Sequence, residues 1–350
     1  MKITEIKALA SGLPPAEKRI FRRIFRVENV TGRLKIPKPL RPWVKEQFGN
    51  LREVEKQRIV KVVNKITFEG SLFNELRGKR PIQAGEESLS ELEEAEGCFF
   101  CQPLQFTAED VFGRIQGEQC ITASNIAKYD AWHGLVIFSR HNPLQYSRET
   151  FESGLNQAIQ WFQQVRAFDS KAKYPFLIWN CLWRGGASIV HGHFQMVMGR
   201  TPYPKIEYLW RCAKRYQARY GSKYFEDLYR VHEALGLGFR LGDAKVFASL
   251  TPIKEKEVIV FSMELESLKE AVYRVLTCYR RLQVSSFNLS LAMPPMAEVK
   301  GWKGFPYLVR LVDRGRLQEK TSDIGGMELY AVSVVSSDPF KLAESLKEAF

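Results

Sequence analysis

The sequence predicts an α+β fold made of two similar halves, preceded by an N-terminal extension. At 350 residues, 45% hydrophobic and 26% charged, the chain is long enough for two domains or one duplicated domain. Beyond the extension, strand-like apolar segments alternate with amphipathic helical ones. The pattern at 123-ASNIAKYDAWHGLVIF-138 returns weakly at 248-ASLTPIKEKEVIVF-261, each time followed by a helix and two apolar strands. We therefore expect an internal duplication.

Residues 1–64 form the predicted extension, which we expect to be helical. They alternate helical-looking segments with a Pro-rich connector, 36-IPKPLRPWV-44, and carry no pattern that indicates chemistry. The N-terminus lacks the apolar stretch and cleavage site of a secretory signal, and no span is apolar for long enough to cross a bilayer. We expect a cytoplasmic protein that does not use a membrane.

The predicted first half covers residues 65–204. An acidic loop or short helix at 81–97 leads into 98-CFFC-101, and 132–147 is expected to be a strand that ends in a His-Asn-Pro turn. Apolar residues at helical spacing predict a helix over 149–168, and buried strands follow at 174–183 and 190–198.

The predicted second half covers residues 205–350. Its two apolar strands are expected at 286–293 and 306–312, after the repeat of the 123–138 pattern. It has no counterpart of His191 and His193. If the first half is catalytic, the second has kept the scaffold alone.

The segment 184-RGGASIVHGHFQMVMGR-200 holds two of the five histidines. In an extended strand, His191, His193 and Gln195 would share one face. Upstream, glycines and polar side chains could bring donors to an anion; these are Arg184, Gly185, Gly186 and Ser188. A neutral imidazole is a good nucleophile toward phosphorus, and Gln195 suits the growing charge on phosphate oxygens. The alternative is a metal-binding pair or two structural polar residues.

Cysteine spacing indicates a metal site. Six cysteines are too sparse for a disulfide scaffold, but Cys98 and Cys101 have the spacing of a metal knuckle. With His141 and His191 they make a Cys2His2 set, the composition of a closed structural zinc site. His193 then remains free for chemistry. The alternative for the cysteines is a redox pair or two structural thiols.

The formal charge of +13 suits nucleic acid, an anionic membrane surface or phosphorylated small molecules. Basic residues occur throughout the chain, with short clusters at 18-KRIFRR-23 and 77-RGKR-80. Because no nucleic-acid-binding module is recognisable, we do not expect that partner. A zinc-containing nucleic-acid-binding protein stays the non-enzymatic alternative.

The segment G-A-S-I-V-H-G-H-F-Q resembles the signature of the galactose-1-phosphate uridylyltransferase branch of the histidine triad superfamily. That signature is His-Pro-His-x-Gln, preceded by Gly-x-Ser and accompanied by C-x-x-C. The resemblance covers about residues 65–350, with 74-NELRGKRP-81 and 320-KTSDIGGMELYAV-332 similar to further family segments. Gly192 stands where the family has proline, Phe194 where it has a small residue, and 325-GGMEL-329 lacks the family's Gly-Tyr-Glu. A-S-I-V-H-G-H-F-Q is also close to the GDP-hexose phosphorylases of this superfamily.

The resemblance implies two histidine-triad-like half-domains, a structural zinc ion and a homodimer. It implies His193 as the nucleotidylated nucleophile and Cys98, Cys101, His141 and His191 as zinc ligands. Asn125, Asn180, Ser188 and Gln195 match positions that bind base, ribose or phosphates, and Arg184, Arg200, Lys320 and Glu328 are further substrate candidates. The expected reaction transfers a nucleoside monophosphate from a nucleotide sugar to a hexose 1-phosphate. Alternatives are a GDP- or ADP-hexose phosphorylase that uses inorganic phosphate, or a dinucleoside polyphosphate phosphorylase.

Overall fold

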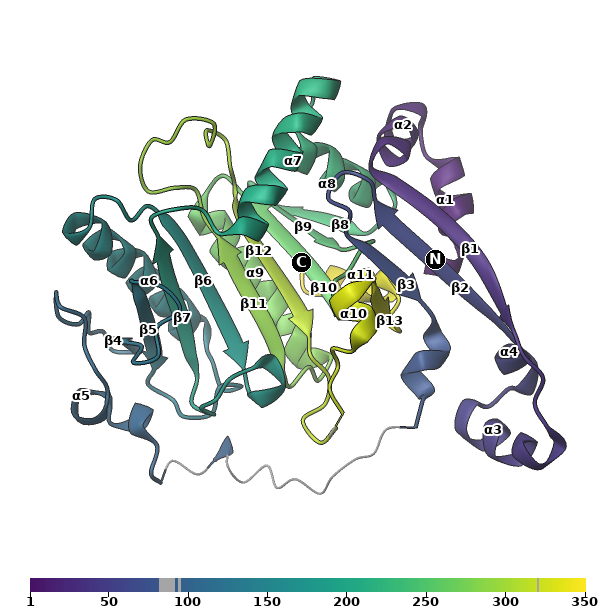
Figure 1. The fold of residues 1–350 in the computed structure, drawn as a ribbon, viewed down its shortest axis with the longest axis horizontal. Helices are drawn as coiled ribbons and strands as arrows, with labels where there is room; N and C mark the ends of the chain where they lie inside the picture. The colour runs from purple at the N-terminus through teal and green to yellow at the C-terminus, as the bar shows by residue number, and fades with distance from the viewer. Residues whose placement is uncertain (82–91, 94–95, 320) are drawn as a thin grey trace.

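One nine-stranded antiparallel sheet organises the molecule. The computed structural model describes residues 1–81, 92–93, 96–319 and 321–350; most of the predicted acidic segment 81–97 lies outside these ranges. The strand order is β4-β5-β7-β6-β11-β12-β10-β9-β8 (Figure 1). The strands are β4 (Cys120–Ser124), β5 (His133–Phe138), β6 (Tyr174–Cys181), β7 (His193–Gly199), β8 (Gly238–Leu241), β9 (Ala244–Ala248), β10 (Glu255–Ser262), β11 (Phe287–Ala292) and β12 (Tyr307–Asp313).

The order of these strands shows the duplication. β4-β5-β7-β6 is mirrored by β9-β10-β12-β11, and the two sets meet where β6 pairs with β11. In each half a long helix joins the second strand to the third, α6 (Arg148–Phe168) in the first and α9 (Leu265–Arg281) in the second. The strands and helices predicted from the sequence are therefore found in place. The two halves share a single sheet.

The register makes individual positions of the two halves equivalent. Gln195 pairs with Ile178, Ile178 with Ser290, and Ser290 with Arg310, so these four residues form one row across β7, β6, β11 and β12. Gln195 is opposite Leu135 on β5, as Arg310 is opposite Ile259 on β10. Gln195 and Arg310 thus occupy corresponding positions on the same face of the sheet.

Helices cover the two faces unequally. α6 and α9 contact each other and pack against one face of the sheet, and α11 (Pro339–Lys347) contacts α9 there. On the other face, α7 (Pro204–Tyr220) and α8 (Tyr224–Ala234) cover the second half, because their side chains meet those of β9, β10 and β12. The same face of the first half carries His193 and Gln195.

The N-terminal extension contains strands as well as helices. α1 (Ile6–Gly12) and α2 (Pro15–Ile24) precede β1 (Phe25–Arg33), which pairs along its whole length with β2 (Lys56–Asn64). β3 (Gly70–Phe73) and β13 (Ser333–Val335) complete a second, four-stranded sheet. Between β1 and β2, α3 (Arg41–Phe48) and α4 (Leu51–Glu55) surround a small core of Ile36, Val44 and Val54. The sequence predicted the helices and missed this long strand pair.

The remaining helices are short: α5 (Pro103–Phe106) follows the cysteine knuckle, and α10 (Gly326–Tyr330) precedes β13. Among the described residues, no helix combines the length and the apolarity that a membrane span requires.

Candidate functional site

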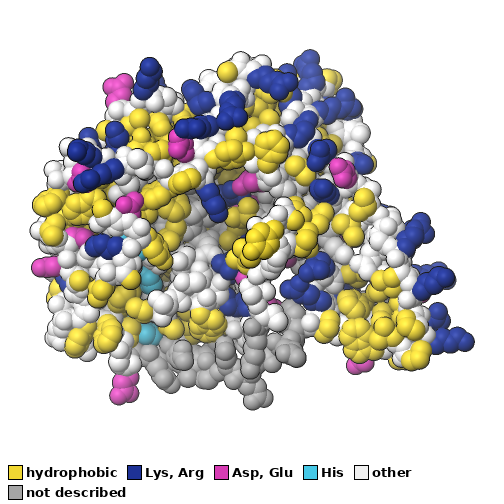
Figure 2. All heavy atoms as spheres, in the orientation of Figure 1, with side chains coloured by type: hydrophobic (Ala, Val, Ile, Leu, Met, Phe, Trp, Pro, Cys, Tyr) yellow, Lys and Arg dark blue, Asp and Glu magenta, His cyan; other side chains and the backbone are white. Residues whose placement is uncertain are grey.

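The two histidines of the His-x-His segment point in different directions. β7 begins at His193, so His191 lies in the preceding turn and does not join the predicted row of side chains. The side chains that share this face along β7 start at His193 and continue with Gln195, and both residues are more than nine-tenths buried. Histidine side chains are visible on the first-half side of the molecule (Figure 2). An added Cβ at Gly192 would lie 2.6 Å from the Phe138 ring, which explains a glycine between the histidines.

The four predicted metal ligands lie together. The ligand atoms of Cys98, Cys101, His141 and His191 all lie within 4.8 Å of one another. Cys101 Sγ lies 3.4 Å from the Nδ1 atoms of both His141 and His191, and Cys98 Sγ lies 3.6 Å from His191 Nδ1. Ligands at 2.0–2.3 Å from a tetrahedral zinc ion would be roughly 3.5 Å apart. The cluster therefore has the composition and the spacing of a zinc site.

The surroundings of His191 also fit a metal ligand. Its Nε2 lies 2.7 Å from the carbonyl oxygen of Phe138, and because a carbonyl only accepts, Nε2 carries the proton. Nδ1 then directs its lone pair at the cysteines, while the other ring nitrogen is held by a backbone carbonyl, which is usual for metal-bound histidines. Burial, with smaller contributions from His141 and His193, lowers the pKa of His191 to about 4. The ring is therefore neutral, the form that binds a metal.

A hydrogen bond fixes the tautomer of His193. Its Nδ1 lies 2.8 Å from the carbonyl oxygen of His191, so Nδ1 donates and Nε2 keeps its lone pair. Burial is the main cause that lowers the pKa of His193, which keeps the ring neutral. The Phe100 ring of the cysteine knuckle packs edge-on against the rings of His193, at 5.2 Å, and of His191, at 5.9 Å. Phe100 thus links the Cys2His2 cluster to the His193 ring.

Sequence reasoning missed another buried histidine of the first half, His133. Its Nδ1 accepts the Tyr129 N–H at 3.0 Å, so Nε2 carries the proton and donates to Gln195 Oε1 at 3.1 Å. The Asn125 amide lies 3.3 Å from the same nitrogen. His133 thereby fixes the orientation of the Gln195 amide, and the amide nitrogen is left as the donor. The signal in the sequence was a lone histidine in the apolar run 132-WHGLVIF-138.

Asn180 belongs to a polar chain that crosses between the halves. Continuing the β6–β7 register by two residues places Asn180 beside His193. Asn180 Oδ1 accepts from Asn288 Nδ2 at 2.8 Å, and Asn288 Oδ1 accepts from Arg314. Arg314 lines a groove of about 910 Å³ that also holds Arg77, Arg80 and Arg316. The groove also holds acidic side chains, and one of them, Asp323, accepts two hydrogen bonds from Arg314. Asn180 and Asn288 therefore connect the surroundings of His193 to a groove of mixed charge.

The loop after β6 is organised by its own hydrogen bonds. The N–H groups of Gly185 and Gly186 donate to the carbonyls of Leu182 and Trp183, and an added Cβ at Gly185 would lie 2.8 Å from the Phe287 carbonyl oxygen. Arg184 donates to the carbonyls of residues 314, 319 and 321. Here the glycines allow close approach to β11, and Arg184 fixes the 314–321 segment. The phosphate-binding roles expected for these three residues stay predictions.

The other predicted residues lie apart from His193 or are engaged elsewhere. Ser188 is exposed in a hollow beside Cys98 and His141. Arg200 is exposed and pairs with Asp169 at 2.9 Å. Glu328 lines the arginine groove but accepts from the N–H groups of Gly325 and Val334. Lys320 lies outside the described residues.

The second half carries a different set of residues at the equivalent positions. Glu257 takes the place of His133, Arg310 that of Gln195 and Leu308 that of His193. The Ser249 N–H donates to the Glu257 carbonyl at 3.0 Å, as Asn125 N–H donates to His133 at 2.9 Å. Arg310 Nε donates to Glu257 at 2.7 Å, so this pair joins the same two positions as the His133–Gln195 hydrogen bond, with the donor on the other strand.

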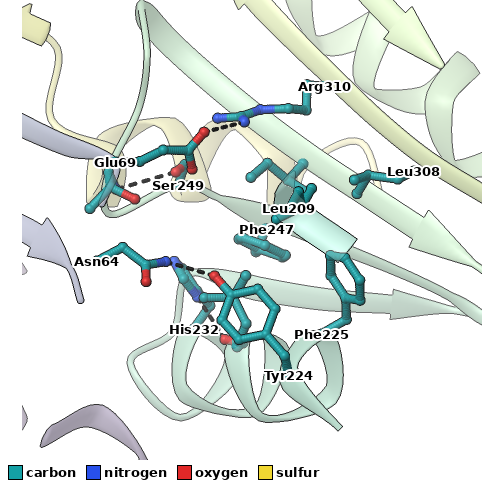
Figure 3. Close-up of a pocket in the computed structure, with 13 residues that line it drawn as sticks. Asn64, Glu69, Leu209, Tyr224, Phe225, His232, Phe247, Ser249, Leu308 and Arg310 are labelled. Carbon is teal, nitrogen blue, oxygen red and sulfur yellow. Dashed lines mark hydrogen bonds and ion pairs between the residues drawn. The ribbon is translucent and has the colours of Figure 1, made fainter. Parts of the chain in front are cut away.

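Neighbouring elements surround this second position. Tyr224 and Phe225 of α8, Leu209 of α7 and Asn64 of β2 surround Arg310, and Glu69 forms a second ion pair with it (Figure 3). The remaining cavity is about 30 Å³, enough for water and far below the roughly 300 Å³ of a ligand pocket. The first half therefore holds the candidate reaction site.

Comparisons with known proteins identify the fold. No family model matches the sequence, and no curated protein matches it either. Among solved structures, an ADP-glucose phosphorylase from Arabidopsis thaliana is similar with a TM-score of 0.61 and 15% identity, covering 82% of this chain and 97% of that one. A uridylyltransferase gives 0.57 and 14%, with the same coverage. A GalT-like protein from Arabidopsis thaliana gives 0.56 and 15%, covering 73% and 93%. At these identities the likeness confirms the predicted fold.

Proposed function

We propose that this chain is a nucleotidyltransferase that acts on a nucleotide sugar through a covalent nucleotidyl-His193 intermediate. His193 Nε2 attacks the α-phosphorus and forms a P–N bond while the bond from phosphorus to the sugar phosphate oxygen breaks. Sugar 1-phosphate leaves with that electron pair. A phosphate oxygen of the acceptor then attacks phosphorus, the P–N bond breaks, and the neutral imidazole is regenerated.

The hydrogen bond between His193 Nδ1 and the His191 carbonyl is the observation that carries this proposal. It holds the ring in the tautomer whose Nε2 is nucleophilic, and it stabilises the cation that forms when Nε2 bonds to phosphorus. Burial keeps the resting ring neutral at pH 7. A histidine with these properties next to a fixed amide donor suits phosphoryl transfer better than a purely structural role.

Gln195 is the donor that we assign to the α-phosphate oxygens. His133 occupies its carbonyl oxygen, so the amide nitrogen is turned to the nucleophile side of the row. A donor fixed before the reaction stabilises the charge that grows on the phosphate oxygens without reorganising. Asn180 lies beside His193 on the other neighbouring strand and suits the ribose or a second phosphate oxygen.

The acceptor phosphate fits the groove that holds Arg77, Arg80, Arg314 and Arg316. Arg314 is linked to Asn180 through Asn288, so a ligand in the groove lies at the end of the row that contains His193. Guanidinium groups bind phosphate with paired donors, and Arg77, Arg80 and Arg316 can supply them, because Arg314 already pairs with Asp323. The groove suits a hexose 1-phosphate, the acceptor of a uridylyltransferase, and inorganic phosphate, the acceptor of a phosphorylase. The likeness to an ADP-glucose phosphorylase keeps the second acceptor open.

A zinc ion would be held by Cys98, Cys101, His141 and His191, and four protein ligands leave no open position for water. When bound, it supplies a rigid link between the knuckle, the turn before β7 and the loop after β5. Phe100 then stays against the two histidine rings. The chain's own His193, Gln195 and Asn180 perform the binding and the transfer.

Intact-mass spectrometry after incubation with separate UDP-, GDP- and ADP-sugars tests the proposal. We expect the mass of one nucleoside monophosphate to be added with one base, and no addition in His193→Ala. Adding hexose 1-phosphate or inorganic phosphate should empty the adduct, and the acceptor that does so names the reaction. Diadenosine polyphosphates serve as the third donor class. If no donor gives an adduct or a product, the proposal is wrong.

A further inference from the structure

Positive charge is concentrated in the N-terminal extension, although basic residues occur along the whole chain. Residues 1–64 hold 16 of the 52 Lys and Arg but only 6 of the 39 Asp and Glu, so they carry +10 of the net +13. The proposed reaction site lies in the other 286 residues, which are nearly balanced. The extension therefore has an electrostatic property that the proposed chemistry does not use.

At the end of the β1–β2 pair, the basic side chains are exposed. We call residues 33–58 the tip: it comprises the strand ends, α3 and α4. Its basic side chains are all exposed, namely Arg33, Lys35, Lys38, Arg41, Lys45, Arg52, Lys56 and Arg58. Against them stand Glu46, Glu53 and Glu55. None of the eight forms an ion pair with a residue that the structure describes. These charges are available to an external polyanion.

Apolar side chains accompany the free charges. Leu34 and Leu40 are each 45% exposed, and Trp43 is 44% exposed. Figure 2 shows hydrophobic side chains gathered over α3 and α4 at the lower right of the molecule, with Lys and Arg along the adjoining edge. The tip has its own small core of Ile36, Val44 and Val54, so these three apolar side chains are not needed to fill it.

We infer that the tip docks the protein onto an anionic phospholipid membrane as a peripheral protein. Lysines and arginines near an anionic surface each add attraction, and exposed leucine and tryptophan side chains insert at the headgroup level. A surface that binds single-stranded nucleic acid would carry several exposed aromatic side chains on which bases stack. In the tip, Trp43 is the one exposed aromatic residue. This inference does not depend on the proposed reaction. It departs from the sequence-based expectation of a protein that does not use a membrane.

Vesicle co-sedimentation of the full chain tests the inference. We expect binding to vesicles of phosphatidylcholine with phosphatidylglycerol, weakened by salt, and little binding to pure phosphatidylcholine. Replacing Lys35, Lys38 and Lys45 together by glutamine should weaken binding roughly a hundredfold. Trp43→Ala should also weaken vesicle binding, and most strongly at high salt, where insertion of apolar side chains matters most. The matched control replaces the exposed Lys171, Lys205 and Lys223 by glutamine and should leave binding within about twofold.

Three results would overturn the inference. One is the absence of binding to anionic vesicles. Another is an equal loss in the control variant, which would mean that net charge alone acts. The third is tight binding to an RNA oligonucleotide, or a change of oligomeric state in sedimentation, that depends on the tip while vesicle binding does not. Because all substituted lysines are exposed, circular dichroism should show the same fold in every variant.

Discussion

Gln195 and Arg310 occupy equivalent positions of the two halves, and their surroundings differ completely. Gln195 accepts one hydrogen bond from neutral His133 and lies two residues from His193. Arg310 pairs with Glu257 and Glu69 beneath α7 and α8. Burial opposes the charge on Arg310, but the two carboxylates outweigh it and raise its pKa. The equivalent positions therefore hold neutral polar groups in the first half and an ion-pair cluster in the second.

The second half lacks a counterpart of the His193 imidazole, and other elements pack around the equivalent position. Leu308 replaces His193, and Leu209, Tyr224 and Phe225 line the small cavity beside it. The first half has a Cys2His2 cluster with the composition of a metal site, and the described part of the second half has no such cluster. The two halves therefore depend on different interactions for their local order.

Loss of a metal ligand should have the largest effect of all. This effect on zinc binding and on nucleotidyl transfer should be confined to the first half. Cys101→Ser should abolish the binding of one zinc ion per chain, because structural zinc sites contribute roughly 10–16 kcal/mol. The turn before β7 would then lose its link to Phe100, and nucleotidyl transfer should fail. Metal analysis of the purified chain and thermal unfolding measure both effects. Cys212→Ala, at a buried cysteine of α7, is the control that should keep the metal. Equal zinc content in both variants would contradict the assignment.

Loss of Arg310 should have the next largest effect, and on stability rather than chemistry. Arg310→Met leaves Glu257, which is about 1% exposed, without its ion partner, at a cost of about 3–5 kcal/mol in the free energy of unfolding. Adding Glu257→Gln should recover part of this loss. Urea unfolding measures it, and adduct formation at His193 should be unchanged where the protein is folded. An active-site defect with normal stability would show that the second position takes part in the reaction.

Loss of Gln195 should slow the chemistry while stability changes little. Gln195→Ala removes one fixed donor for the α-phosphate, an effect on the order of a hundredfold in turnover. Ser290 lies in the same cross-strand row as Gln195, on β11, so Ser290→Ala is a matched control. Its turnover should stay within about twofold of that of the unchanged protein. The rate of adduct formation, followed by intact mass, distinguishes the two. A Gln195→Ala rate like that of the control would remove Gln195 from the mechanism.

The parts of the fold predicted correctly are those whose signal is local. The apolar runs of β6 and β7 and the helical spacing in α6 give nearly the observed bounds, whereas β5 ends at Phe138, before the predicted His-Asn-Pro turn. Cys-x-x-C with two histidines gives the Cys2His2 cluster. β1 was missed because six of its nine residues are exposed and its sequence, FRVENVTGR, is polar on both faces. His191 was wrongly placed in the row because its contact with Phe138 comes from a distant segment. No local pattern shows that a strand starts two residues later.

His133 shows the same limit, and it should give the smallest effect of the four. Its partner Gln195 lies 62 residues away, so the pair exists only through the β5–β7 register. We expect His133→Ala to reduce kcat about tenfold, because the Gln195 amide loses its fixed orientation. In a Gln195→Ala background the same change should cost little more, since there is no amide left to orient. Single-turnover rates of the four variants in this cycle measure the coupling. Independent, multiplicative losses would show that His133 acts on the site by another route.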